Sequence, residues 1–396
     1  MSEILILGAG MVGVGTALAL QARGHAVTLL DRRPPGQETS FGNAGVIQAE
    51  AMEPYAMPRD PATLLRYALG RSNDVSLSWR DLPRFARPLL TYFRASAGRS
   101  HAEISRHYAR MIARVRDDHR PLIEASGAGA LIRESGLGEL YRSEGRLERA
   151  VPEARRKADT YGLQLRVVSG EVLQTEDPAI KGPVAGALIW DDSWSCIDPG
   201  ALVTAYAELF RKSGGTILNG NADSLQPAQT GWRVQSDTGE VVAEHTVIAL
   251  GPWSADFVKR FGYSVPMLLK RGYHTHLHPL VQPTRPYLDA EHGYVLAPMR
   301  AGLRLTSGAE LVAQHRPQRP FQLDQATRAI RTLIPDIADG NGTIWHGHRP
   351  CLPGMLPRVG KAARHRGLWF NFGHGHQGFT LGPTTGHLLA QMLDDA

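Results

Sequence analysis

The alternation of apolar and polar positions divides the chain into strand-like and helix-like segments. Short apolar runs bounded by turn residues predict strands at 3–7, 26–30, 138–142, 185–190, 216–218, 246–251 and 367–372. Apolar positions three or four apart predict helices at 14–23, through most of 82–126, and at 151–161, 200–212, 323–333 and 383–393. Asp198 before Pro199 is typical of a helix start, since it combines a capping side chain with a proline in the first turn. Strands that alternate with helices in this way favour a parallel sheet.

A different pattern follows in the second half of the chain. Two short alternating runs flank residues 237–239, which predicts a β-hairpin. Residues 265–344 are rich in strand-like runs with Pro and Gly between them and contain one good helix, and 273–278 alternates at period two. We therefore expect an antiparallel sheet separate from the parallel one.

The first thirty-one residues combine a strand, Gly8-x-Gly10-x-x-Gly13, a helix, a second strand and Asp31. Gly8 allows a sharp turn, Gly10 lets the backbone approach a pyrophosphate, and Gly13 allows close packing of helix on sheet. The helix N-terminus offers free N–H groups to phosphate. Asp31 lies where a carboxylate can bind ribose hydroxyls, which argues against a 2′-phosphate. This order predicts a dinucleotide site that does not take NADP.

Small and polar residues fill 39–46, just beyond that acid. Small residues let the backbone approach a flat ligand, and Ser40 and Asn43 supply hydrogen bonds. An ordinary surface loop is the alternative.

Length and composition narrow the class of protein. With 396 residues, 42% hydrophobic and 21% charged, the chain is an ordinary globular protein, expected to form two domains. No apolar run approaches a membrane span, and a first strand at residue 3 leaves no room for a signal peptide, so we expect a cytoplasmic location. The two cysteines give no disulfide framework. His274, His276 and His278 share one strand face without an acid or cysteine partner, so no metal site is expected.

The net charge is +6, and ten arginines against four acids lie between residues 80 and 120. Solvated helix faces are the default explanation, contact with anionic lipid is the second, and nucleic acid is the third because no aromatic-rich binding module accompanies the arginines.

Four patches of sequence resemble one family, the FAD-dependent amino-acid oxidoreductases of the D-amino acid oxidase and glycine oxidase type. The bacterial D-amino acid dehydrogenase branch is the most similar. The patches are the βαβ start, 39–45, 249–254, and a C-terminal block formed by 347–350 and 373–378. Branch members usually carry an acid where Gly354 stands and aliphatic residues where Gln377 and Phe379 stand, so this chain departs from the pattern near the substrate.

The resemblance implies FAD as cofactor and an α/β fold. A Rossmann-like FAD-binding domain, with a parallel sheet and helices, would be interleaved with an α+β substrate domain built on an antiparallel sheet. We expect 1–80, 145–225, 243–262 and 345–396 in the first domain and 81–144, 226–242 and 263–344, with a helical insertion, in the second. The cofactor residues it implies are Gly8, Gly10, Met11, Val12, Gly13, Asp31, Arg32, Ser40, Asn43, Ala44, Gly45, Val46, Ala222, Gly251, Trp253, Gly373, His374, Gly375, His376, Gln377 and Gly378.

The resemblance also implies a small anionic amino-acid substrate. A planar guanidinium binds a carboxylate through two parallel hydrogen bonds, and Arg349 is the candidate, with a structural surface arginine as the alternative. Tyr273 and Tyr294 are candidates to close the pocket, and His348 to meet substrate or flavin, with plain structural roles equally open. Free N–H groups in 373–378 would stabilise negative charge on the reduced flavin.

The expected reaction is oxidative deamination. Hydride passes from the α-carbon of a D-amino acid, or of a cyclic or N-substituted one, to flavin N5, and the imine hydrolyses to a 2-oxo acid. A dehydrogenase would pass electrons to a quinone, with the basic 80–120 region on the inner face of the cytoplasmic membrane. An oxidase of the glycine or sarcosine type would use oxygen. The alternatives are a flavoprotein acting on an aminomethyl group of tRNA, although no nucleic-acid partner is expected, and an NAD-dependent dehydrogenase.

Overall fold

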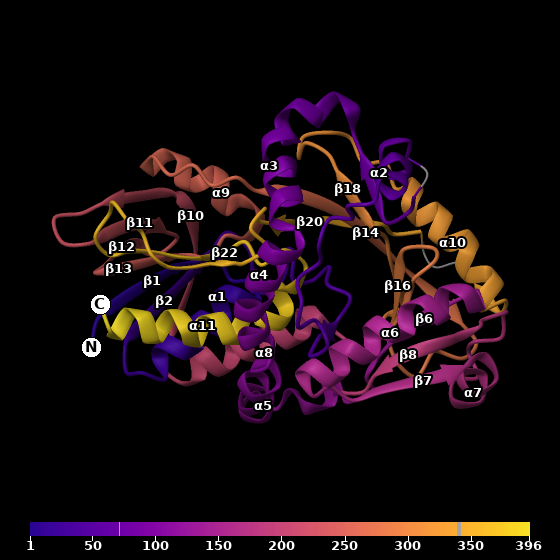
Figure 1. The fold of residues 1–396 in the computed structure, drawn as a ribbon. Helices are drawn as coiled ribbons and strands as arrows, with labels where there is room; N and C mark the ends of the chain where they lie inside the picture. Colours follow the sequence, from indigo (N-terminus) through magenta and orange to yellow (C-terminus); the bar gives the residue numbers. More distant parts are fainter. Residues whose placement is uncertain (71, 339–341) are drawn as a thin grey trace.

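The computed structural model describes residues 1–70, 72–338 and 342–396. Residues 71 and 339–341, which fall in the expected segments 1–80 and 263–344, lie outside the described residues. Two large sheets stand side by side with helices packed around them, and both chain termini lie at the outer end of the first sheet (Figure 1).

The first sheet has eight strands among the described residues, in the order β12-β11-β10-β2-β1-β13-β22-β21. Strands β10 to β22 in this order run parallel, which confirms the predicted βαβ start and parallel sheet. Their bounds are β1 (Glu3–Leu7), β2 (Ala26–Asp31), β10 (Thr216–Pro227), β11 (Trp232–Ser236), β12 (Gly239–Ala243), β13 (His245–Ile248), β21 (Arg358–Lys361) and β22 (Leu368–Phe372).

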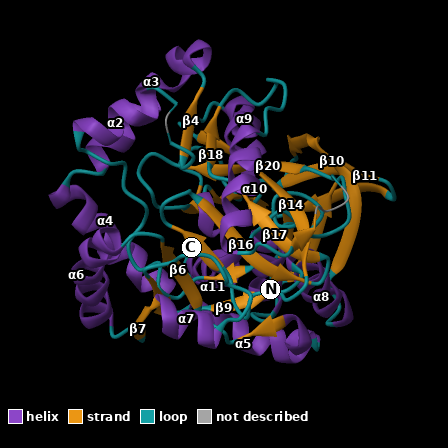
Figure 2. Ribbon diagram, turned by 90° about the vertical axis from the view of Figure 1, so that its right-hand side faces the viewer, coloured by secondary structure: helices purple, strands orange, loops and turns teal. Residues whose placement is uncertain are grey.

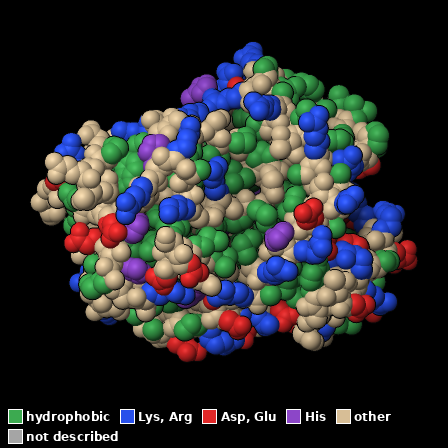
Figure 3. Space-filling view, turned by 60° about the vertical axis from the view of Figure 1, so that its left-hand side comes forward, with side chains coloured by type: hydrophobic (Ala, Val, Ile, Leu, Met, Phe, Trp, Pro, Cys, Tyr) green, Lys and Arg blue, Asp and Glu red, His purple; other side chains and the backbone are tan. Residues whose placement is uncertain are grey.

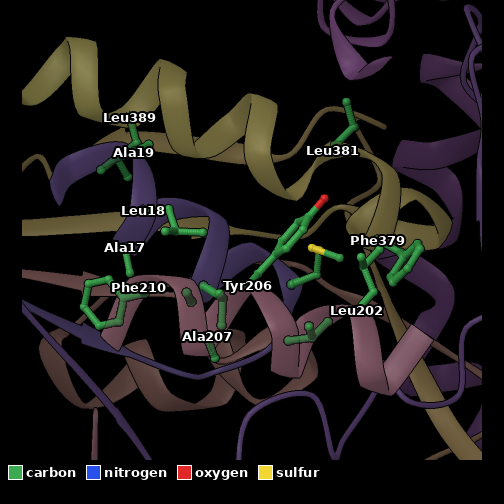
Figure 4. Packing of buried hydrophobic residues seen from close by; sticks show 14 of the residues in the cluster. Ala17, Leu18, Ala19, Leu202, Tyr206, Ala207, Phe210, Phe379, Leu381 and Leu389 are labelled. Atoms are coloured by element: carbon green, nitrogen blue, oxygen red, sulfur yellow. The ribbon is translucent and has the colours of Figure 1, made fainter. Parts of the chain in front are cut away.

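Three helices cover one face of this sheet: α1 (Met11–Gln21), α8 (Pro199–Lys212) and α11 (Gly378–Asp394). Figure 4 shows Leu18 of α1, Tyr206 of α8 and Leu381 of α11 converging on one apolar cluster. The Asp198 side chain accepts a hydrogen bond from the Ala201 N–H at 3.0 Å, which confirms the predicted start of α8. This core fixes the N-terminal ends of α1 and α11 at the edge of the sheet.

The second sheet has the strand order β4-β18-β14-β17-β16-β15-β6-β8-β7, with β19 and β20 also paired to β14. Most of its pairs are antiparallel, as predicted. Its bounds are β4 (Val75–Leu77), β6 (Leu137–Tyr141), β7 (Leu165–Ser169), β8 (Gly186–Trp190), β14 (Leu268–Pro279), β15 (Tyr287–Asp289), β16 (Tyr294–Met299), β17 (Gly302–Thr306), β18 (Ala309–Leu311), β19 (Ile337–Ala338) and β20 (Trp345–Cys351).

The remaining helices lie around both sheets. Figure 2 shows α2, α3, α4 and α6 together on one flank of the molecule. Their bounds, with those of the others, are α2 (Pro61–Ala68), α3 (Leu82–Ala95), α4 (Gly98–Ile112), α5 (Val115–Ser126), α6 (Glu144–Tyr161), α7 (Gly170–Glu176), α9 (Ser254–Phe257) and α10 (Phe321–Leu333). A separate small sheet has the strand order β3 (Val46–Ile47), β9 (Trp194–Cys196), β5 (Ile132–Arg133).

Strand pairing corrects the expected grouping of three segments. The hairpin β11–β12, expected in the substrate domain, extends the first sheet through β10, whereas β7–β8 and β20, expected in the FAD-binding domain, pair with β6 and β14 of the second sheet. Partner choice between strands depends on tertiary packing, which local periodicity does not encode. The domain boundaries themselves stay a prediction.

Candidate active site

A cavity of about 600 Å³ lies where the carboxyl ends of the parallel strands meet the second sheet. Gly8, Asp31, Ala249–Gly251 and Asn371–Gly373 border it at the ends of β1, β2, β13 and β22, and Gly220–Asp223 border it from β10. This is the position at which open parallel sheets bind their ligands, because the strand ends leave a crevice there.

The glycines of the first turn shape this crevice. Gly8 has φ +109°, and a Cβ there would lie 2.4 Å from the Ala249 carbonyl oxygen. A Cβ on Gly13 would lie 1.7 Å from the Gly8 carbonyl oxygen, so Gly13 permits close helix packing and does not itself border the cavity. The Met11 N–H donates to Ser40 Oγ at 3.0 Å, which docks the 39–46 tract on the N-terminus of α1.

Asp31 and Arg32 stabilise the same end of the cavity. The Asp31 carboxylate accepts hydrogen bonds from the N–H groups of Ala9, at 2.7 Å, and Arg33, at 3.1 Å. It therefore holds the glycine turn in shape as well as facing the cavity. The Arg32 guanidinium lies 4.6 Å from the ring centroid of Trp253, so two residues implied for cofactor binding contact each other.

Most residues implied for cofactor binding border this one cavity. They are Gly8, Gly10, Met11, Val12, Asp31, Arg32, Ser40, Asn43, Ala44, Val46, Ala222, Gly251, Trp253, Gly373, His374, Gly375, His376 and Gly378. Gly13, Gly45 and Gln377 lie behind its wall. A Cβ on Gly45 would lie 2.2 Å from the Cys196 carbonyl oxygen, and the Gln377 amide donates to Gln48 Oε1 at 2.6 Å.

The cavity fits an elongated dinucleotide with a flat ring. It extends from the N-terminal end of α1 to that of α11, and both ends present backbone amides to it. The buried Asn371 Oδ1 on its wall has no hydrogen-bond partner. Burial lowers the pKa of His374 to about 3, so this ring is neutral, and its Nε2 lies 2.9 Å from Thr385 Oγ1. The His374 ring therefore brings no positive charge to the 373–378 turn.

Arg349, on β20, also borders the cavity. Its Nη1 and Nη2 donate to the carbonyls of Gly308 and Ser307 at 3.1 and 3.3 Å. A Cβ on Gly272 would lie 2.6 Å from Arg349 Nη2, so this glycine makes room for the guanidinium. Burial lowers the pKa of Arg349, and no carboxylate of the described residues forms an ion pair with it. A half-buried guanidinium with spare donors is a natural anion site.

The three other candidates present no free polar group to the cavity. The Tyr273 hydroxyl donates to Glu310 Oε2 at 2.8 Å and accepts from the Arg319 N–H. Tyr273 borders the cavity, but its hydroxyl is hydrogen-bonded on the opposite face of β14. The Tyr294 hydroxyl accepts from Arg142 at 3.0 Å in the core of the second sheet. His348 is buried and does not border the cavity. It lies next to Arg349 on β20, and neighbouring strand residues point to opposite faces.

The cavity also contains residues that the sequence analysis did not select: Gln48, Glu50, Tyr55, Glu139, Thr306 and Trp345. One signal was available, because Val46, Gln48 and Glu50 alternate in the continuation of the 39–46 tract. Burial raises the pKa of Glu50, whose carboxylate accepts from Ser193 Oγ at 2.5 Å and from the Gln48 amide at 2.6 Å.

The histidines of β14 form no metal site. His274 stacks on Trp345 with ring centroids 5.0 Å apart, and His276 Nε2 accepts from Arg304 at 3.2 Å. Within residues 1–70, 72–338 and 342–396, no group of three or more His, Cys, Asp or Glu side chains is placed to hold a metal ion. Cys196 and Cys351 are both buried and unbridged.

The family described as FAD dependent oxidoreductase matches residues 3–392, and the chain belongs to this family. Relatives include a D-amino-acid oxidase from Bradyrhizobium diazoefficiens, 27% identical over 99% of this chain and 94% of the relative, and a D-amino acid dehydrogenase 2 from Mesorhizobium japonicum, 29% identical over 99% and 96%. The solved glycine oxidase from Geobacillus kaustophilus is similar in fold, with a TM-score of 0.74 at 20% identity over 100% of this chain and 95% of that one.

Membership in this family confirms the resemblance seen in the sequence, the FAD cofactor and the oxidoreductase class, and the similar solved structure confirms the α/β fold. It also removes the NAD-dependent alternative. None of the described helices combines the length and apolarity required to cross a membrane.

Proposed function

We propose that this protein oxidises an amino acid, with hydride transfer from the α-carbon to flavin N5. The observation that carries the proposal is Arg349, a half-buried guanidinium that borders the FAD cavity and has no carboxylate partner among the described residues. An α-carboxylate would complete its hydrogen bonding. The names of the two relatives above, a D-amino-acid oxidase and a D-amino acid dehydrogenase, support the same substrate class.

The chain's own contribution to this reaction is placement. Arg349 would bind the substrate carboxylate, while the carbonyls of Ser307 and Gly308 hold the guanidinium in one orientation. FAD, when bound, supplies the two-electron acceptor. The substrate amine must be neutral when the hydride leaves, and water then hydrolyses the imine to a 2-oxo acid and ammonia. Because the amine is already neutral, the reaction needs no general base, and placement of the α-carbon by Arg349 is the main task of the chain.

Substitution of Arg349 tests the proposal. Arg349→Ala should raise KM for a reactive amino acid by a factor of about ten to a hundred, since a charge-assisted pair contributes roughly 1.5–3 kcal/mol. Arg349→Lys should recover part of the loss because it restores charge without the planar fork. Arg328→Ala, on the exposed face of α10, is the matched control. An unchanged KM in Arg349→Ala, with FAD still bound, would refute the clamp.

We also propose that the electrons leave to a quinone-type carrier at an anionic membrane. Four exposed apolar side chains support it: Leu65 and Leu69 at α2, Trp79 before α3 and Leu90 on α3, each at least 49% exposed. Helices α2 and α3 lie at the same end of the molecule (Figures 1 and 2), and the three arginines of α3, Arg84, Arg87 and Arg94, are exposed. The last arginines of the 80–120 region belong to α5, which lies at the other end (Figure 1). Apolar side chains among arginines are typical of a surface that lies on anionic lipid. Figure 3 shows basic side chains at the top of the molecule and over other parts of the face that it draws.

A further inference from the structure

One row of side chains crosses the second sheet along the cavity. The strand register aligns Trp345, His274, Thr306, Val295, Leu288 and Glu139 across six adjacent strands. All except His274, which Trp345 covers, border the cavity. Residues opposite each other in a sheet point to the same face. The row therefore forms one continuous wall that ends in a carboxylate.

The Arg349 guanidinium lies near Thr306, in the part of this wall that is remote from Glu139. It contacts the carbonyls of Ser307 and Gly308, directly after Thr306 in the chain. Thr306 Oγ1 is buried, borders the cavity and has no hydrogen-bond partner. From Thr306 the wall continues over two apolar side chains, Val295 and Leu288, to Glu139. Three strand spacings separate Thr306 from Glu139, about 14 Å between backbones. The order along the wall is thus cation, hydroxyl, apolar stretch and anion.

Glu139 is fixed in place but its charge is not neutralised. Its two carboxylate oxygens accept hydrogen bonds from Trp190 Nε1 at 2.9 Å and from the Tyr141 hydroxyl at 3.1 Å. Neutral donors orient a carboxylate and leave its charge in place. No Lys, Arg or His of the part of the chain that the structure describes forms an ion pair with Glu139.

Glu50 adds a second carboxylate to the same space. Gln377 donates to Gln48, Gln48 donates to Glu50 Oε1, and Ser193 donates to Glu50 Oε2. Gln377 is one of the positions at which this chain departs from its family, and the network gives it a role in holding Glu50. The Glu50 and Glu139 charges repel each other, and neither has a cationic partner among the described residues.

We propose that this cavity selects an amino acid with a positively charged side chain, with its α-carboxylate at Arg349, its aliphatic stem along Val295 and Leu288, and its cation at Glu139. Glu50 strengthens the negative potential at that end. The inference rests on the proposed function and adds the substrate class. Lysine and arginine have this combination of an aliphatic stem and a terminal charge, whereas a small neutral amino acid would leave Glu139 without a partner.

Arginine and citrulline test the inference, since they are nearly isosteric and differ in the side-chain charge. We expect kcat/KM for arginine to exceed that for citrulline at least about tenfold in the reactive enantiomer, with both D and L forms measured. Glu139→Gln should bring this ratio close to one, and Glu50→Gln should lower it by a smaller factor. Glu148→Gln, at an exposed position of α6, should keep the wild-type ratio.

A binding measurement makes the test independent of turnover. Calorimetry of the FAD-loaded protein with 5-guanidinopentanoate, which has no amine to oxidise, should show tighter binding than with hexanoate, and Glu139→Gln should remove the difference. Equal kcat/KM for arginine and citrulline, or a ratio unchanged by Glu139→Gln, would overturn this inference. The proposed function would still stand if the protein oxidised neutral amino acids. Flavin reduction by no amino acid would overturn both.

Discussion

At the scale of single residues, Gly272 and Arg349 depend on each other. The guanidinium occupies the space that a side chain at Gly272 would need, because a Cβ there would lie 2.6–2.7 Å from the guanidinium atoms. The positively charged group is thus held against a strand, in a residue that borders the cavity. If Arg349 binds the substrate carboxylate as proposed, this glycine sets where that carboxylate lies by placing the guanidinium.

Gly272→Ala tests this dependence. The added methyl group should displace the guanidinium and lower kcat/KM by about tenfold, corresponding to roughly 1.4 kcal/mol, although the charge of Arg349 is retained. Steady-state kinetics and bound-FAD content measure the two effects separately. Gly129→Ala, where no atom lies within 4 Å, is the control. Full activity in Gly272→Ala would show that the guanidinium position is unimportant.

The residue candidates show which part of a site a sequence can reveal. Arg349 could be selected because an arginine has few buried uses besides binding an anion, and the family motif marks it. The orientation of Tyr273, Tyr294 and His348 could not be predicted, since it depends on which face of each strand meets the cavity. Glu139 was missed because the neighbours that align it with Thr306 come from strands more than a hundred residues away in sequence.

At the scale of elements, the contact between α1 and α11 determines where the two helix N-termini meet the cavity. A Cβ on Gly386 of α11 would lie 2.7 Å from the Gly15 carbonyl oxygen of α1, and a Cβ on Gly15 would lie 2.9 Å from the Gly382 backbone. The helices approach this closely only because these positions lack side chains. Their packing helps to hold both helix ends at the edge of the sheet.

Gly386→Ala should therefore destabilise the protein by about 1–3 kcal/mol, because overpacking separates the helices. Thermal unfolding of the FAD-loaded protein measures the loss, and the bound-FAD fraction should fall with it. Gly98→Ala at the start of α4 has open space around it and should have little effect or stabilise slightly. If Gly386→Ala unfolds at the same temperature as the wild type, the close contact does not contribute to stability.

Most elements were predictable from the chain because periodicity and capping are local. The helices α8 and α10 and the hairpin β11–β12 all lie within a few residues of their expected positions. The grouping of strands into sheets was predicted less well. The long strand β10 begins in parallel contact with β2 and ends in antiparallel contact with β11. One strand therefore joins the parallel strands to the hairpin, which the sequence presents as separate segments.

At the scale of the whole molecule, the cavity lies between two sheets that carry different parts of the task. The parallel sheet supplies the glycine turns and helix ends for FAD, and the antiparallel sheet supplies Arg349 and the wall of side chains. No residue of α2 or α3 borders the cavity, which is consistent with a separate role of these helices in docking.

Vesicle co-sedimentation tests the proposed membrane contact. The protein should bind phosphatidylglycerol vesicles and not phosphatidylcholine vesicles, and salt should weaken binding because the arginine attraction is screened. Trp79→Glu should reduce binding about fivefold or more, at roughly 1 kcal/mol or above. Leu280→Glu, 85% exposed away from these helices, is the control. Equal binding of Trp79→Glu and wild type would refute this surface.

Oxidation of an amino acid by the FAD-loaded protein can be observed as anaerobic bleaching of the flavin. The FAD-loaded protein is mixed under argon with D-, L-, cyclic and N-methyl amino acids, and the flavin absorbance is followed. We expect rapid bleaching by at least one amino acid, slowed strongly by Arg349→Ala at low substrate concentration. Flavin that stays oxidised with every member of the panel, while dithionite still reduces it, would contradict the proposed function.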